Sequence, residues 1–117
     1  MGVTVLIVDD HPSFRRLAKR LLVDAGFAVV GEAADAAAAL SEAERLRPDV
    51  VLLDVVLPDR SGLAVAQELA LSGEGPRVVL ISSRSRSDFG DSFAWPPGCR
   101  FLPKHQLTVA RLREVLR

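Results

Sequence analysis

The sequence predicts an α/β domain in which helices cover both faces of a parallel β-sheet. Five short apolar runs, rich in valine, leucine and isoleucine, alternate with segments of helical periodicity along the 117 residues. Continuous apolar runs of this kind are typical of strands that are buried on both faces. Their alternation with helices favours parallel strands joined by right-handed crossovers. The length suits one domain.

The first half of the chain predicts three strands, at residues 3–8, 27–31 and 49–54. Apolar residues recur with helical spacing over residues 14–25, and Gly26 follows at the place of a helix C-terminal cap. Asp35 is a suitable N-cap for a second helix. Pro48 ends that helix, because the residue before a proline disfavours the helical conformation.

The second half predicts a turn at 58–62, a helix at 63–71, strands at 77–82 and 99–102, and a last helix capped by Thr108. The signal is weaker between residues 83 and 98. A short helix is expected there over residues 88–94, interrupted by Gly90.

Composition excludes several classes of protein. The formal net charge is zero, which argues against a domain that binds nucleic acid directly, since such binding needs clustered and unbalanced positive charge. A single cysteine excludes a disulfide scaffold and a cysteine-rich zinc site. No apolar run approaches the roughly 20 residues that span a bilayer, and the start does not read as a signal peptide. We therefore expect a cytoplasmic protein with no membrane association.

Charged and hydroxyl side chains follow the predicted strands where each one ends. They are Asp9, Asp10, Asp54, Ser82 and Lys104. Ligands of parallel α/β sheets bind at the carboxyl ends of the strands, so these residues are expected to converge. Three carboxylates in one pocket repel each other unless a cation joins them, and a hard ion such as Mg²⁺ suits oxygen ligands. Beside a metal, a carboxylate can attack phosphorus and form an aspartyl phosphate.

These residues together resemble the signature of the receiver domain of two-component response regulators. The resemblance covers essentially the whole chain and includes the segment DVVLP from Asp54, followed by Gly62. The segments DDHP and VVGEAADAAAAL are most similar to the NarL/LuxR-type subfamily, whose members carry a helix-turn-helix output domain. The resemblance implies a flavodoxin-like (βα)5 fold with strand order 2-1-3-4-5. It also implies a single receiver domain over residues 1–117, with no output domain present.

The resemblance implies a phosphoacceptor and a metal site. Asp54 would accept a phosphoryl group from a histidine kinase or phosphotransfer protein. Mg²⁺ would be bound by Asp10, Asp54 and the backbone carbonyl of Val56, with Asp9 acting directly or through water. The domain would also catalyse its own phosphorylation and dephosphorylation, without being an enzyme in any other sense.

The resemblance further implies a conformational switch. Lys104 and Ser82 would contact the phosphoryl group, and Ser82 and Phe101 would be the switch residues that control an output, a partner or a homodimer formed on phosphorylation. The chain has Ser82 where threonine is commoner in the family, and His105 where proline is common after the lysine. Residues 84–98 lack the acidic and apolar pattern usual for the family's fourth helix.

Two other functions compete with this interpretation. A degenerate receiver would act as a binding module independent of phosphorylation, but the intact acidic set argues against it. A phosphatase with an aspartate nucleophile would need two aspartates separated by one residue on the first strand and a cap over the site. In this sequence the two aspartates, Asp9 and Asp10, are adjacent, which argues against a phosphatase. For His11, a solvated turn residue is favoured over a functional role.

Overall fold

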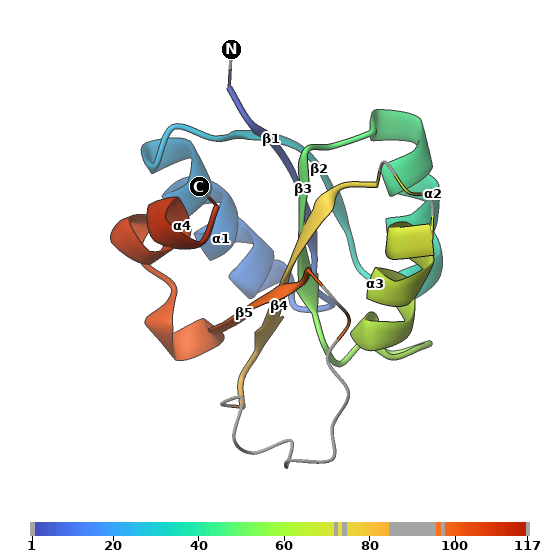
Figure 1. Ribbon diagram of the computed structural model, residues 1–117. Helices are drawn as coiled ribbons and strands as arrows, with labels where there is room; N and C mark the ends of the chain where they lie inside the picture. The colour runs from blue at the N-terminus through green and yellow to red at the C-terminus, as the bar shows by residue number, and fades with distance from the viewer. Residues whose placement is uncertain (1, 72, 74, 85–95, 97, 117) are drawn as a thin grey trace.

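The computed structural model describes residues 2–71, 73, 75–84, 96 and 98–116 of the chain. Five parallel strands form one sheet in the order β2-β1-β3-β4-β5 (Figure 1). This confirms the predicted flavodoxin-like order. The strands are β1 (Thr4–Val8), β2 (Ala28–Ala33), β3 (Val50–Asp54), β4 (Arg77–Ser82) and β5 (Arg100–Pro103).

Helices cover both faces of the sheet, as predicted. The first and last described helices pack on one face, and the middle two pack on the other (Figure 1). The two on the first face are α1 (Pro12–Asp24) and α4 (Val109–Val115). The two on the second face are α2 (Ala36–Leu46) and α3 (Gly62–Leu71). A short 3₁₀ helix, η2 (Lys104–Gln106), follows β5 and was not expected from the sequence.

Each central strand contributes to two apolar cores. In β1, Leu6 and Val8 pack toward α2 and α3, whereas Val5 and Ile7 pack toward α1 and α4, and all four are fully buried. The alternation arises because successive side chains of a strand point to opposite faces. Each such side chain contributes about 1.5–3 kcal/mol relative to its exposed state. The continuous apolar runs in the sequence therefore have a direct structural cause.

Helix ends follow the predicted signals with one exception. The Asp35 side chain accepts a hydrogen bond from the backbone N–H of Ala38 at 2.7 Å, and Thr108 caps α4 in the same way. Gly26 follows α1 with a φ of +96°. The exception is Arg47, which closes α2 in the left-handed conformation with a φ of 46°. Glycine is the usual residue there, so the sequence did not predict this geometry.

Gly62 fixes the course of the chain directly after β3. A Cβ atom at this position would lie 2.0 Å from the backbone oxygen of Asp54. The Gly62 N–H also donates a hydrogen bond of 2.7 Å to the carbonyl of Val55. Glycine is therefore required here because the start of α3 passes against the backbone of the β3 end.

The helix expected over residues 88–94 lies outside the described residues.

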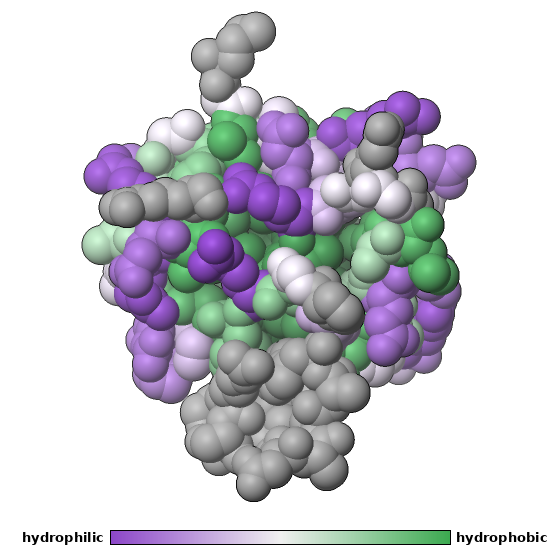
Figure 2. Space-filling view, viewed as in Figure 1, coloured by the Kyte–Doolittle hydropathy of each residue, from purple (hydrophilic) through white to green (hydrophobic). Residues whose placement is uncertain are grey.

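Figure 2 shows hydrophilic residues over the helices at both sides of the view, with hydrophobic residues visible between them. Among the helices in the described part of the chain, none combines the length and apolar character needed to cross a membrane.

Candidate functional site at the carboxyl ends of the strands

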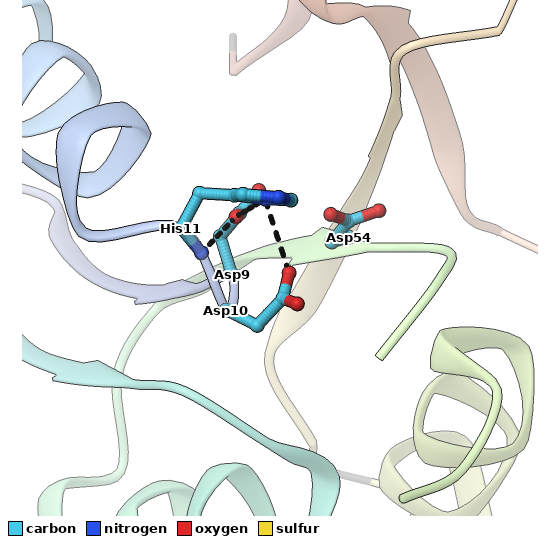
Figure 3. Close-up of side chains that lie close together, drawn as sticks. All are labelled: Asp9, Asp10, His11 and Asp54. Atoms are coloured by element: carbon cyan, nitrogen blue, oxygen red, sulfur yellow. Dashed lines mark hydrogen bonds and ion pairs between the residues drawn. The ribbon is translucent and has the colours of Figure 1, made fainter. Parts of the chain in front are cut away.

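Parallel pairing brings the predicted site residues to one edge of the sheet. Asp9 and Asp10 follow β1, and Asp54 is the last residue of β3, which pairs directly with β1. One ligand atom from each of Asp9, Asp10, His11 and Asp54 can be chosen so that all lie within 4.8 Å of one another. Figure 3 shows the Asp54 carboxylate next to the three side chains that follow β1. The predicted convergence of the aspartates is thus observed.

Lys104 joins the two buried carboxylates. Its Nζ lies 2.6 Å from Asp9 Oδ2 and 3.0 Å from Asp54 Oδ2. The side chain of Asp9 is fully buried, and that of Asp54 is 6% exposed. Lys104 also lies over the ring of Phe14, with 4.4 Å between Nζ and the ring centroid. The sequence predicted that Lys104 lies at this edge with the aspartates, but neither these ion pairs nor the aromatic contact.

The two buried carboxylates differ in their protonation chemistry. Burial raises the pKa of Asp54, and the nearby Asp9 adds to this, although the Val56 N–H and Lys104 oppose it. Burial also favours a higher pKa for Asp9, but its ion pair with Lys104 and the hydrogen bond from the His11 N–H outweigh burial and lower that pKa. Lys104 has a raised pKa because its bonds to both carboxylates outweigh its own burial. The ammonium therefore stays charged between them.

Backbone contacts orient the acidic groups. The Val56 N–H donates a hydrogen bond of 3.0 Å to Asp54 Oδ1, which leaves Oδ2 toward Lys104. Arg15 Nη1 donates to the backbone carbonyl of Asp9 at 2.6 Å, and Arg15 Nε pairs with Glu32 at 3.0 Å. Arg15 thus ties α1 to the ends of β1 and β2. Sequence reasoning missed it, because no local pattern distinguishes a clamping arginine from a solvated one.

His11 is exposed, as the sequence analysis favoured, but it also contacts the acidic cluster, which was not predicted. Its side chain is 66% exposed, yet Nδ1 lies 3.1 Å from both Asp9 Oδ1 and Asp10 Oδ1 (Figure 3). Its backbone N–H donates to the same Asp9 oxygen at 2.8 Å. The residue is solvated on one side and part of the acidic cluster on the other. The signal available in the sequence was the contiguous Asp-Asp-His at a strand end.

The two predicted switch residues lie on neighbouring strands. Ser82 ends β4, is 2% exposed, and its Oγ accepts a hydrogen bond of 3.1 Å from the Arg84 N–H. Phe101 in β5 is partly buried against the core beneath α2 and α3. The β4–β5 register places Ser82 opposite Pro103, directly before Lys104. A switching role for Ser82 and Phe101 stays a prediction.

The donor set fits a hard divalent cation. Three carboxylates meet at the edge and a single ammonium, from Lys104, lies within ion-pair distance of two of them. The excess of negative charge favours an added cation, and carboxylates with a backbone carbonyl are ligands that Mg²⁺ accepts. The carbonyl of Val56 belongs to the loop directly after Asp54.

The fold and this edge define a flavodoxin-like domain with an acidic, lysine-bridged site at the carboxyl ends of its strands. The chain matches the family model of the response regulator receiver domain over residues 5–116. It belongs to the response regulator receiver family.

Curated relatives support the same family. The chain is 36% identical over 118 residues to the probable transcriptional regulatory protein TcrX of Mycobacterium tuberculosis, covering 98% of this chain and 50% of TcrX. It is 44% identical over 82 residues to protein-glutamate methylesterase/protein-glutamine glutaminase 5 of Myxococcus xanthus, covering 69% of this chain and 24% of that protein. The chain therefore spans half or less of the length of these relatives.

Solved structures agree. The signal receiver domain of the putative response regulator NarL from M. tuberculosis superposes with a TM-score of 0.76 at 32% identity, covering 98% of this chain and 97% of that one. The relatives include regulators and a methylesterase by name, so the family is established without the LuxR-type subfamily being singled out.

Proposed function

We propose that this domain is a phosphorylation switch in which Asp54 accepts a phosphoryl group in a Mg²⁺-dependent reaction. The observation that carries this proposal is the position of Lys104, whose ammonium contacts Asp54 and Asp9 beside the carboxylate of Asp10. Asp54 is a buried carboxylate within reach of a cation at the ligand-binding edge of the fold, and such a group suits a nucleophile toward phosphorus.

The two oxygens of Asp54 have different partners. Oδ1 accepts the Val56 N–H at 3.0 Å, and Oδ2 contacts Lys104 Nζ at 3.0 Å. During transfer, a lone pair of one carboxylate oxygen forms the new O–P bond, and the bond from phosphorus to the donor's leaving atom breaks with its electrons. When bound by Asp9, Asp10, Asp54 and the Val56 carbonyl, Mg²⁺ would neutralise charge on the phosphoryl oxygens.

Two further groups would bind the product. The Lys104 ammonium would pair with a phosphoryl oxygen, and the Ser82 hydroxyl, at the end of the adjacent strand, would donate a hydrogen bond to another. Ser82 Oγ accepts a hydrogen bond from the Arg84 N–H, so a movement of the hydroxyl toward a phosphoryl group would be passed through this bond to the chain after β4. Through β5, this change would reach Phe101 and bias a conformational equilibrium.

The physiological donor would be a histidine kinase or a phosphotransfer protein. As finer proposals, the output is of the LuxR type, which the resemblance of the DDHP and VVGEAADAAAAL segments supports, and phosphorylation promotes a homodimer. Self-phosphorylation from small donors and self-dephosphorylation belong to the same proposal. A binding module that needs no phosphate would not explain why two carboxylates are buried at this edge and bridged by Lys104.

The test is incubation with acetyl phosphate, with and without Mg²⁺, followed by intact-mass spectrometry. The wild type should gain one phosphoryl group only with Mg²⁺, and Asp54→Asn should gain none. Asp24→Asn, which changes an exposed aspartate at the end of α1, is the matched control and should behave as wild type. An adduct on Asp54→Asn would contradict the assignment. No adduct on the wild type would favour the binding module, and sustained turnover of phosphate monoesters would favour a phosphatase.

A further inference from the structure

His11 brings a nitrogen ligand to a site that is otherwise built from oxygen. Its Nδ1 faces the same space as the carboxylates of Asp9 and Asp10, from a position directly before α1 (Figure 3). The side chain is 66% exposed, so solvent and ions can reach it. An imidazole suits Co²⁺, Ni²⁺ and Zn²⁺, whereas Mg²⁺ prefers oxygen.

The spacing of the ligand atoms matches one coordination shell. Nδ1 lies 3.1 Å from Asp9 Oδ1 and 3.1 Å from Asp10 Oδ1. For metal–ligand bonds of about 2.1 Å, neighbouring ligands of an octahedron are about 3.0 Å apart. The distances from Nδ1 to the two carboxylate oxygens therefore match those between adjacent ligands, and Asp54 belongs to the same group, in which one ligand atom from each residue lies within 4.8 Å of the others.

A second observation is the state of the Asp9 carboxylate. Asp9 is fully buried, and its Oδ2 faces the Lys104 ammonium at 2.6 Å without a hydrogen bond of good geometry. A buried carboxylate of this kind gains from an additional positive charge. Its other oxygen, Oδ1, is the one that His11 approaches.

We propose that His11 Nδ1 is a metal ligand, which makes this site prefer a late first-row divalent ion over Mg²⁺. The inference rests on the metal site of the proposed function and adds the chemical class of a second, tighter-binding ion. In the tautomer that carries its proton on Nε2, the Nδ1 lone pair is free for the metal. A competing explanation is that His11 only donates a hydrogen bond to the two carboxylates.

The experiment compares Co²⁺ and Mg²⁺ binding by the wild type, His11→Gln and His105→Gln, using calorimetry. Glutamine keeps a hydrogen-bond donor but removes the imidazole. His105 is the second of the two histidines, is exposed, and serves as the matched control. His11→Gln should bind Co²⁺ at least tenfold more weakly than wild type and Mg²⁺ within twofold of it, whereas His105→Gln should match wild type for both ions.

Proton NMR of the Co²⁺ form gives a direct readout of ligation. A ligated His11 should show a paramagnetically shifted, exchangeable imidazole N–H that is present in wild type and His105→Gln and absent in His11→Gln. Unchanged Co²⁺ affinity, or an equal loss for Co²⁺ and Mg²⁺, would overturn the proposal. Phosphorylation with Mg²⁺ separates the two proposals. If His11→Gln is phosphorylated but does not lose Co²⁺ affinity selectively, only the ligand role of His11 is wrong. If it loses Co²⁺ affinity selectively but the wild type forms no phosphoryl adduct, only the phosphoacceptor role of Asp54 is wrong.

Discussion

The carboxylate of Asp59 accepts a hydrogen bond of 2.8 Å from the backbone N–H of Ala36 and so ties the loop after β3 to the first turn of α2. Its second oxygen accepts the Ala37 N–H at 3.0 Å. Asp35 caps the next N–H of the same helix. Two carboxylates from distant parts of the chain thus satisfy successive donors that a helix leaves free at its start.

The first prediction concerns the pH dependence of this tie. The hydrogen bonds from Ala36 and Ala37 lower the pKa of Asp59 below its ordinary value of 3.8. A depressed pKa in the folded state means that the ionised carboxylate stabilises the fold above about pH 4 and that this contribution is lost as pH falls through the folded pKa. Asp59→Asn should lower the melting temperature at pH 7, with the difference from wild type shrinking below pH 3.8. Asp24→Asn is the control, and a difference independent of pH would contradict the argument.

The second prediction concerns Gly62. Replacement by alanine places a Cβ 2.0 Å from the Asp54 backbone oxygen, and the next nearest atoms, the Asp54 carbonyl carbon and Val55 Cα, are also backbone atoms that cannot easily move. We expect Gly62→Ala to destabilise the fold by about 1–3 kcal/mol, the usual cost of overpacking. Urea unfolding measures this. The control is Gly2→Ala, where the nearest atom would be 3.7 Å from the new Cβ, and its free energy of unfolding should stay within about 0.5 kcal/mol of wild type. Equal losses of stability in the two variants would show that the close approach at Gly62 is not the cause.

The third prediction concerns metal binding. A cation that joins the acidic cluster should stabilise the folded state, by about 1.4 kcal/mol when its concentration is ten times its Kd. Asp10→Ala should remove most of this Mg²⁺ effect and leave the lysine bridge between Asp9 and Asp54 in place. Thermal unfolding against Mg²⁺ concentration measures both. Glu68→Gln, on α3 and away from the cluster, is the control, and a Mg²⁺ response that survives Asp10→Ala would place the ion elsewhere.

The fourth prediction concerns the proposed switch. Ser82→Ala removes the hydroxyl that would bind the phosphoryl group but retains the apolar part of the β4 end. Addition of beryllofluoride and Mg²⁺ should shift the aromatic NMR signals of Phe101 in wild type and shift them by less than half as much in Ser82→Ala. Ser61→Ala, in the loop before α3, is the matched serine control. Wild-type shifts in Ser82→Ala would rule out coupling through this hydroxyl.

The strands and most helix ends were predictable because their signals are local. Burial on both faces leaves continuous apolar runs, and Asp35 and Thr108 are capping residues whose own side chains bond within the next few residues. The convergence of Asp9, Asp54 and Lys104 was also predictable, because parallel strands bring their carboxyl ends together. In these cases a pattern along the chain determines a position in space.

Two of the remaining features depend on partners far away in sequence, and the third is a backbone conformation that its residue type does not indicate. Asp59 caps a helix that begins 23 residues earlier. Arg15 reaches the backbone of Asp9 and the side chain of Glu32 from α1. Arg47 adopts a left-handed conformation that its residue type disfavours. None of these contacts has a periodic signature, so only the folded arrangement identifies them.

The lysine bridge neutralises part of the negative charge of the site. Because the Lys104 ammonium already lies 2.6 Å from Asp9 and 3.0 Å from Asp54, the domain can fold without importing a counterion. A divalent ion that binds Asp9 or Asp54 shares that carboxylate with a tethered cation whose local concentration never changes. The ion concentration needed for binding therefore depends in part on Lys104. A phosphoryl group that draws Lys104 toward itself would lower that concentration. Lys104 is thus a built-in cation that affects the concentration at which the acidic edge binds a divalent ion.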